Sequence, residues 1–380
     1  MVDTFPVWPV YDKDEQEAVL QVLQTGRGNY WSGEFGKQFE DSFATWCGAK
    51  HGLCVSNGTV AIEIALKSLG ISAGDEVIVP ARSFLASAAS VVAVNAKPVF
   101  ADIEIGTGNI CPKSIHANIS SNTKAIIVVH LDGCPAKMDE IMDIARSNGL
   151  LVIEDCAQAH GASIRSQMVG TFGDIGTFSF CQDKIMSTGG EGGMIVTNSN
   201  DYYEVSWSFR DHGRDRALTL SGDHPPGFRW LQTRFGTNAR MTEIQSAIGC
   251  CQLKKVDEWV KQRQSNAAQL CEIVASWDGA QVPEHLAQHQ SVFYRLGVLC
   301  ESEQIRNYYM QSLRRLGIPA TVGACPEIYE EAAFKIAGLC PRERLSNAVE
   351  QGKRYLAIPV HPGVETAISR FLEVNSPVHP

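Results

Sequence analysis

The segment that decides the fold is Ala125–Gly161, AIIVVHLDGCPAKMDEIMDIARSNGLLVIEDCAQAHG. It begins with an apolar run that ends at His130, continues with an amphipathic stretch from Met138 to Ser147, and returns to an apolar run over Leu150–Ile153. The two runs have the length of buried strands, and the stretch between them has helical spacing. A strand–helix–strand unit predicts parallel strands with a helix packed on their sheet.

The same alternation continues on both sides of this unit, so we expect an α/β fold built on a mostly parallel, seven-stranded sheet. Further helices are expected at Asp12–Gln24, Phe35–Trp46, Val60–Ser68 and Phe84–Val94. The other five expected strands are Leu53–Val55, Glu76–Val79, Pro98–Ala101, Thr177–Phe180 and Gly193–Thr197.

The C-terminal third has a different pattern. A long helix is expected over Thr242–Ala267, followed by a strand at Ser291–Leu299 and helices at Ile305–Leu316 and Leu345–Leu356. This mixture predicts a smaller α+β domain. We therefore expect a large domain over residues 1–250, with its N-terminal helical segment, and a connecting helix and small domain over residues 251–380.

Composition narrows the class of protein. A formal net charge of −9 over 380 residues argues against a nucleic-acid binder. No apolar stretch reaches the ~20 residues of a membrane span, and no signal peptide is visible, so a soluble cytoplasmic enzyme is expected. The 12 cysteines are irregularly spaced and lack paired CxxC motifs, which favours reduced thiols and no metal. A metal set of His160, Cys156 and Cys181 is the alternative, although such cysteines suit core packing better.

Polar side chains follow several of the expected strands, at the sheet edge where α/β folds bind ligands. Asp155 ends one strand, where it could serve a ligand or cap a helix. Lys184 lies between two apolar strands, and the alternative for it is a solvated loop lysine. Ser56–Thr59 opens a helix and could bind phosphate or simply cap. Phe84 could stack on a ring or pack in the core.

The glycine-rich run Gly189–Gly193 has neither the GK[ST] of a Walker loop nor the context of a dinucleotide fingerprint. The order along the chain is more informative: phosphate loop, aromatic, aspartate, serine, lysine, glycine-rich turn. Pyridoxal phosphate (PLP) requires a lysine for a Schiff base, a carboxylate at its ring nitrogen, donors for its phosphate and a flat group against its ring. The set predicts a PLP enzyme with Lys184 and Asp155 as catalytic residues.

At these positions the sequence resembles the DegT/DnrJ/StrS family of sugar aminotransferases, which has the aspartate-aminotransferase-like PLP fold type I. The resemblance runs from about Tyr30 to Leu253, with a looser match to Pro362. The motifs that carry it are Ser56-Asn-Gly-Thr59, Gly74-Asp-Glu-Val-Ile78, Glu154-Asp-Cys-Ala-Gln-Ala-His-Gly161, Phe178-Ser-Phe180, Gly190-Glu-Gly-Gly193 and Asn238-Ala-Arg-Met-Thr-Glu243.

The resemblance implies a role for each matching residue. Lys184 would bond to the cofactor and shuttle a proton, and Asp155 would pair with the pyridinium. Asn238 would reach the partner subunit's cofactor, which implies a homodimer with shared active sites. The other implied cofactor contacts are Gly58, Thr59 and Ser179 at the phosphate, Phe84 on the ring and Gln158 near the 3-oxygen. The substrate-binding candidates are Asn29, Tyr30, His130 and Arg240.

The implied activity is amino transfer from L-glutamate to an oxo-sugar, for lipopolysaccharide or another surface glycan. The sequence departs from the family at Asp132, at Gln182-Asp183 before the lysine and at Thr321–Pro326, which puts a nucleotide-linked substrate in doubt. One alternative is a free oxo-sugar acid, 8-oxo-3-deoxy-octulosonate, giving 8-amino-Kdo. Another is a PLP-binding regulator without catalysis. Relatives that dehydrate sugars carry histidine in place of the lysine, so Lys184 argues against dehydration.

Overall fold

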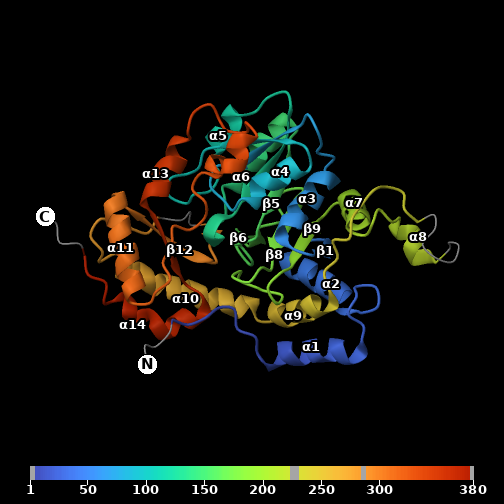
Figure 1. Ribbon diagram of the computed structural model, residues 1–380, viewed down its shortest axis with the longest axis horizontal. Coiled ribbons are helices and arrows are strands. Elements are labelled where there is room, and N and C mark those ends of the chain that lie inside the picture. Colours follow the sequence, from blue (N-terminus) through green and yellow to red (C-terminus); the bar gives the residue numbers. More distant parts are fainter. Residues whose placement is uncertain (1–4, 223–230, 284–287, 377–380) are drawn as a thin grey trace.

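The computed structural model describes residues 5–222, 231–283 and 288–376. Its centre is a seven-stranded sheet with the strand order β1-β9-β8-β5-β4-β2-β3 (Figure 1). The strands are β1 (His51–Val55), β2 (Glu76–Pro80), β3 (Lys97–Ala101), β4 (Thr123–Val129), β5 (Leu151–Asp155), β8 (Ile175–Ser179) and β9 (Gly193–Thr197).

Strand direction matches the prediction. Each neighbouring pair from β8 to β3 is parallel, and β9 runs antiparallel to both β8 and β1. In the strand–helix–strand unit within Ala125–Gly161, β4 and β5 form the expected parallel pair, in a register that places Val129 opposite Asp155. The mostly parallel α/β fold predicted from the sequence is confirmed.

Side chains of β4 show why both sheet faces are covered. Ala125, Ile127 and Val129 belong to the core on one face, and Ile126 and Val128 to the core on the other. Strand side chains alternate with period two, so a fully apolar strand needs a hydrophobic layer on each side. One layer contains α3 (Gly58–Ser68), α4 (Ala86–Ala93) and α7 (Asn200–Arg210); the other contains α2 (Phe35–Cys47), α5 (Pro112–Ala117) and α6 (Met138–Asn148).

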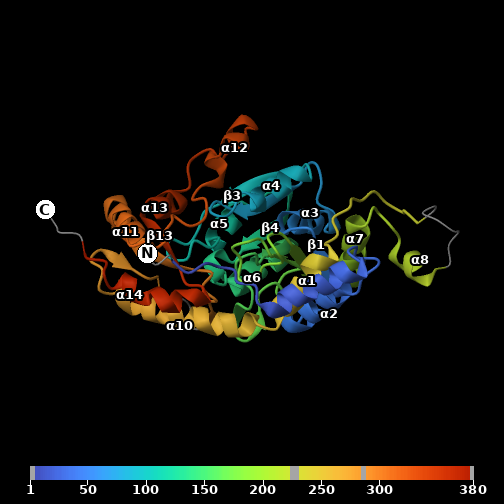
Figure 2. The ribbon, with the colours of Figure 1, turned by 60° about the horizontal axis from the view of Figure 1, so that its bottom comes forward.

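Both ends of the N-terminal helix have capping residues that define its limits. Asp12 and Glu15 form a capping box at the start of α1 (Lys13–Thr25), and Gly26 ends the helix in the left-handed region with φ 66°. Helix α1 packs on α9 (Glu243–Leu253), as Figure 2 shows at the lower edge of the large domain.

The single long helix expected over Thr242–Ala267 is wrong, because the chain forms α9 and then α10 (Val256–Val274). The break falls at Lys254 and Lys255. The Lys255 ammonium binds Asp12, Asp14 and Glu15 at 2.7–3.0 Å, which ties the junction to the start of α1.

The small domain has an antiparallel sheet in the order β10-β12-β13, which packs with its helices around a separate core. Its prediction needs one correction: the helix expected to reach Leu356 ends at Arg354, and an apolar run from Tyr355 pairs with β12 as a strand. The elements are β10 (Ala280–Gln281), β12 (Arg295–Cys300), α11 (Glu303–Arg315), α12 (Ala332–Ile336), α13 (Ser346–Arg354), β13 (Tyr355–Pro359) and α14 (Ile368–Phe371).

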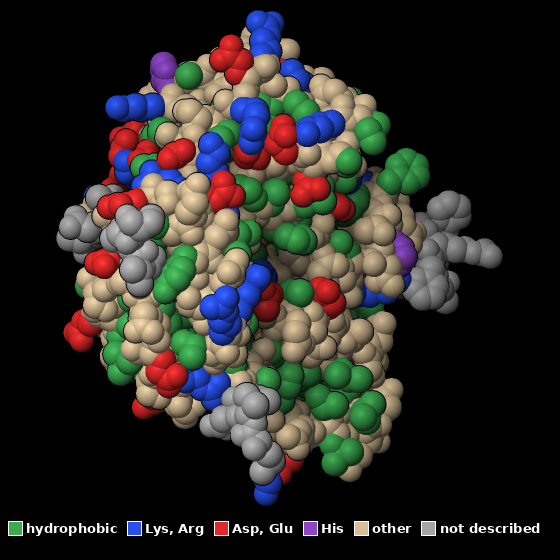
Figure 3. Space-filling view, turned by 60° about the vertical axis from the view of Figure 1, so that its left-hand side comes forward, with side chains coloured by type: hydrophobic (Ala, Val, Ile, Leu, Met, Phe, Trp, Pro, Cys, Tyr) green, Lys and Arg blue, Asp and Glu red, His purple; other side chains and the backbone are tan. Residues whose placement is uncertain are grey.

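The two parts of the chain are joined by more than α10. Strand β11 (His289–Gln290) pairs with β6 (Ser163–Ile164), which pairs with β7 (Gln167–Met168). Seen from the small-domain side, the surface is hollowed near its middle, with basic, acidic and apolar side chains around the hollow (Figure 3). In the described ranges, no helix combines the length and the apolar character needed to cross a bilayer.

Candidate active site

A cavity of about 710 Å³ lies at the carboxyl ends of the central strands, where the polar clusters were predicted to meet. It is lined by seven of the eight residues assigned to cofactor binding: Gly58, Thr59, Phe84, Asp155, Gln158, Ser179 and Lys184. Residues far apart in the sequence converge here because each follows a strand or opens a helix at the same sheet edge.

Asp155 is the last residue of β5 and is buried. Its Oδ2 accepts a hydrogen bond from the Ser87 hydroxyl at 2.9 Å, and its Oδ1 accepts one from the Ala157 N–H at 3.2 Å. Burial raises the pKa of Asp155, while these hydrogen bonds and the charge of Lys184 oppose the rise. A cation beside this carboxylate would stabilise its ionised form.

Lys184 extends from the segment between β8 and β9, and 14% of its side chain is exposed. Its ammonium lies 3.8 Å from the Asp183 carboxylate and 4.9 Å from the centre of the Tyr294 ring. The indole N–H of Trp8 donates to its backbone carbonyl at 2.7 Å. The amine is thus held at the cavity wall by a backbone anchor and remains available for reaction.

One end of the cavity suits a phosphate. Asn57 caps α3 by accepting the Val60 N–H at 2.9 Å, which leaves the Gly58 and Thr59 amides at the helix start directed outward. A Cβ on Gly58 would lie 2.6 Å from the Cβ of Ser179, so only glycine lets this loop approach the Ser179 hydroxyl so closely.

Phe84 follows β2 and lines the cavity. The Phe84 side chain is 66% exposed, so the alternative that it packs in the core is wrong. Across the cavity, the side-chain oxygen of Gln158 accepts the Asp132 N–H at 2.8 Å, which fixes the orientation of its amide.

These residues fit PLP. A buried carboxylate, an amine, an exposed ring and a helix start with glycine and serine provide the four functions that the cofactor requires.

Five predicted residues lie outside this cavity within one chain. Asn238 is exposed, and Arg240 pairs with the buried Asp211. Asn29 accepts the Trp31 N–H at 2.9 Å on the surface, and the Tyr30 hydroxyl donates to Glu40 at 2.9 Å inside the protein. His130 is fully buried behind the sheet edge. Their roles remain predictions.

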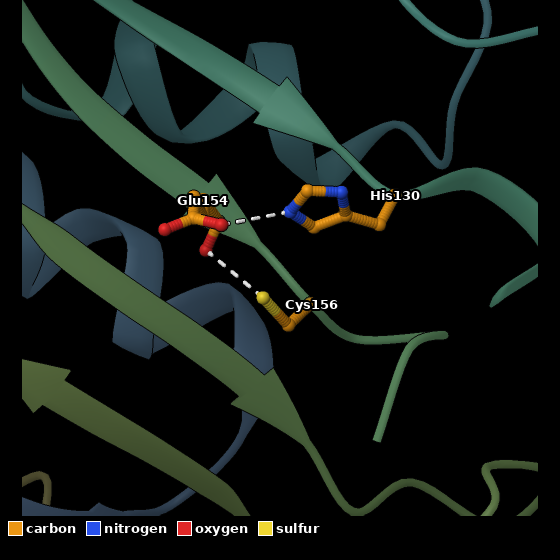
Figure 4. A group of neighbouring side chains, drawn as sticks. All are labelled: His130, Glu154 and Cys156. Carbon is orange, nitrogen blue, oxygen red and sulfur yellow. Dashed lines mark hydrogen bonds and ion pairs between the residues drawn. The ribbon is translucent and has the colours of Figure 1, made fainter. Parts of the chain in front are cut away.

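His130, Glu154 and Cys156 form the cluster shown in Figure 4, in place of the His160, Cys156 and Cys181 set weighed from the sequence. The Ala136 N–H donates to Nδ1 of His130 at 3.0 Å, so Nε2 carries the hydrogen and donates to Glu154 at 3.0 Å. Glu154 also accepts three backbone N–H groups, at 2.7–2.8 Å. Because these atoms already have protein partners, the cluster is suited to bracing the loop after β7 rather than to holding a metal.

Sequence reasoning missed the small-domain side of the cavity. Tyr294 and Arg295 from the start of β12, with Gly323–Cys325, complete its lining. In the sequence, Thr321–Pro326 stands out only as a departure from the family pattern, and no local pattern marks Arg295.

The comparisons with known proteins agree with this geometry. The DegT/DnrJ/EryC1/StrS aminotransferase family matches residues 9–370. The chain belongs to this family. The family is PLP-dependent, and the resemblance inferred from the sequence motifs is confirmed.

Two curated relatives indicate the range of substrates within the family. GDP-perosamine synthase of Caulobacter vibrioides is 42% identical over 259 residues, which cover 67% of this chain and 66% of that enzyme. A putative L-glutamine:3-amino-2,3-dideoxy-scyllo-inosose aminotransferase of Streptoalloteichus tenebrarius is 39% identical over 267 residues, covering 70% of this chain and 62% of that protein. The chain therefore spans slightly under two thirds of the length of each.

A solved structure matches almost end to end. The aminotransferase from Psychrobacter cryohalolentis is 42% identical, with a TM-score of 0.94 over 97% of both chains. The PLP fold type I expected from the sequence is confirmed.

Proposed function

We propose that the protein is a PLP-dependent aminotransferase that moves an amino group from L-glutamate to an oxo-sugar. The observation that carries this proposal is the meeting of Lys184, Asp155 and Phe84 in one cavity with the start of α3. Family membership supports it independently.

The residues divide the work as follows. When bound, PLP supplies an electron sink for the carbon that loses its proton. Asp155 would keep the ring nitrogen protonated through a charged hydrogen bond. In each half of the reaction, the Lys184 amine would carry a proton between the substrate carbon and the cofactor carbon. Gly58, Thr59 and Ser179 would hold the phosphate, and Phe84 would cover the ring.

We assign the acceptor to a nucleotide-linked oxo-sugar or a cyclitol ketone, used for a surface glycan such as lipopolysaccharide. The names of the two curated relatives support this class and do not favour the free sugar acid that yields 8-amino-Kdo.

A homodimer is part of the proposal. Asn238 is exposed and lies outside its own chain's cavity, and Phe235 nearby is 98% exposed. A large exposed ring beside an unused site residue favours contact with a second copy. Leu218 and Leu220 of α8 (Arg216–Ser221) are also exposed in this region.

The test is formation of 2-oxoglutarate from L-glutamate with a panel of nucleotide-linked oxo-sugars and cyclitol ketones. The wild-type protein should convert at least one acceptor and take up PLP with an absorbance band that changes on adding L-glutamate. Lys184→Ala should abolish turnover without altering the circular dichroism spectrum. Turnover by that variant contradicts the role of Lys184, and failure with all acceptors despite PLP uptake favours a non-catalytic regulator.

A further inference from the structure

Arg295 is a positively charged residue in the cavity lining, and the proposed function assigns no role to it. Among the described residues that line the cavity, the positively charged side chains are Lys184 and Arg295. The phosphate end lies at Gly58 and Ser179, and Lys184 is committed to the cofactor. Arg295 comes instead from the start of β12, on the small-domain wall.

The guanidinium of Arg295 is only partly satisfied. Its Nη2 lies 3.4 Å from Oδ2 of Asp183 and 3.2 Å from the Tyr294 hydroxyl. For Nε and Nη1, the described residues provide no hydrogen-bond partner. The side chain is 27% exposed and is part of the cavity lining.

The two cations lie at similar distances from the same ring. The Lys184 ammonium lies 4.9 Å, and the Arg295 guanidinium 4.7 Å, from the centre of the Tyr294 ring. An α-amino acid carries its amine and its carboxylate on one carbon. If the amine is presented to the reactive centre at Lys184, the carboxylate must lie close by, and Arg295 is the adjacent cation with open donors.

The Oδ2 of Asp183 accepts a hydrogen bond from the Tyr294 hydroxyl, and its contact with Arg295 is the looser of the two. Its carboxylate is 55% exposed, and its contact of 3.4 Å with Arg295 is longer than a good charge-assisted hydrogen bond. A carboxylate ligand can instead engage two N–H groups of a guanidinium side by side.

We propose that Arg295 binds the α-carboxylate of the amino donor, and that Asp183 is its counterion when no donor is bound. The inference rests on the proposed aminotransferase function and names the donor subsite of that same cavity.

The experiment compares Arg295→Gln and Arg295→Lys with Arg146→Gln, which removes an exposed arginine from α6. L-glutamate and L-glutamine are used as donors because they share the α-carboxylate and differ in the side chain. Arg295→Gln should raise KM for both donors by roughly 10- to 100-fold, the scale of a lost charged hydrogen bond, with KM for the acceptor unchanged. Arg295→Lys should recover part of the loss, and Arg146→Gln should match wild type.

A binding measurement gives a second readout. In calorimetric titrations of the PLP-loaded enzyme, 2-methyl-L-glutamate lacks the α-hydrogen needed for transfer and reports binding alone. Its affinity should fall in Arg295→Gln by the same factor as the rise in KM, while the melting temperature stays within a few degrees of wild type.

Three results would overturn the inference. The first is that Arg295→Gln leaves both the donor KM and the binding of 2-methyl-L-glutamate unchanged, and the second is that only KM for the acceptor changes. The third is that KM rises for L-glutamate but not for L-glutamine, which would place the side-chain carboxylate of L-glutamate at Arg295. Failure of the wild-type enzyme to transaminate would reject the proposed function, and the titration would still decide whether Arg295 binds the amino acid.

Discussion

Strand β5 ends with two neighbouring carboxylates that lie on opposite faces of the same sheet. Glu154 belongs to the cluster with His130 and accepts four hydrogen bonds from fixed protein donors. Asp155 lines the cavity and accepts two, one of them from the rotatable hydroxyl of Ser87.

The difference between these faces separates structural from chemical roles. Both carboxylates are buried, so burial alone does not identify a functional residue. A buried carboxylate with every oxygen occupied by backbone N–H groups stabilises the fold. One that faces a cavity beside an amine keeps its charge available for a ligand.

Of the two carboxylate substitutions, Glu154→Gln should have the larger effect on stability. The new amide nitrogen would face N–H donors, because both oxygens of Glu154 accept from fixed groups. We expect the free energy of unfolding to fall by about 3 kcal/mol, with kcat of the folded fraction retained. Urea unfolding followed by circular dichroism measures this, and a variant as stable as wild type would contradict the structural role.

Asp155→Asn makes the same chemical change one residue along the chain. In contrast to Glu154→Gln, it should reduce turnover and leave stability unchanged. Stability should hold, since the Ser87 hydroxyl can accept as well as donate and burial already disfavours the ionised carboxylate. Turnover should fall roughly 100-fold, the scale of losing about 3 kcal/mol of charged hydrogen bonding at the ring nitrogen. Steady-state kinetics with the same urea titration measures both. Retained turnover, or a large loss of stability, would remove the contrast with Glu154.

A smaller effect is expected for Phe84→Ala, because its exposed ring contributes little to the core. Affinity for PLP should fall by about 5- to 10-fold through loss of stacking, while unfolding changes by less than about 1 kcal/mol. The matched control is Phe178→Ala, whose buried ring should cost about 3–5 kcal/mol of stability. Fluorescence titration of PLP and urea unfolding provide the two values, and equal destabilisation by both variants would place Phe84 in the core after all.

The smallest expected effect is the contribution of His160 to the pH dependence of stability. His160 is fully buried, and no described residue forms a hydrogen bond with either ring nitrogen. Burial lowers the pKa of His160 to about 3. The unfolded chain binds the proton near pH 6.5, so this contribution to stability is complete above that pH and is lost as the pH falls toward 3. His160 alone should reduce stability by about 1 kcal/mol between pH 7 and pH 5.5. His160→Gln should weaken this pH dependence in urea titrations, and an identical slope would reject the assignment.

The seven-stranded sheet was predictable because its signals are local. Apolar runs of strand length alternate with amphipathic segments, and each strand of the sheet was found within a few residues. The placement of Asp155 and Lys184 at one cavity was predictable in the same way, from a strand end and a motif.

The small-domain wall was not predictable for a physical reason. Arg295 reaches the cavity through the pairing of β12 with β13 and through the docking of Tyr294 on the loop at Asp132, contacts between distant segments. The pattern of the segment from Leu345 predicts a helix that includes Tyr355, whereas pairing with β12 makes Tyr355 part of a strand. Such tertiary preferences override local ones and leave no trace in spacing.

The hydrogen bond from Trp8 to the Lys184 carbonyl bears on how the protein is made. Trp8 packs edge-on against Trp259 at 5.0 Å and lies beneath the Arg263 guanidinium at 5.1 Å. A nascent chain emerges N-terminus first, so Trp8 and Lys184 are both synthesised before the helix that holds the indole in place. The contact between Trp8 and the backbone of Lys184 therefore gains its supporting neighbours only when α10 has left the ribosome.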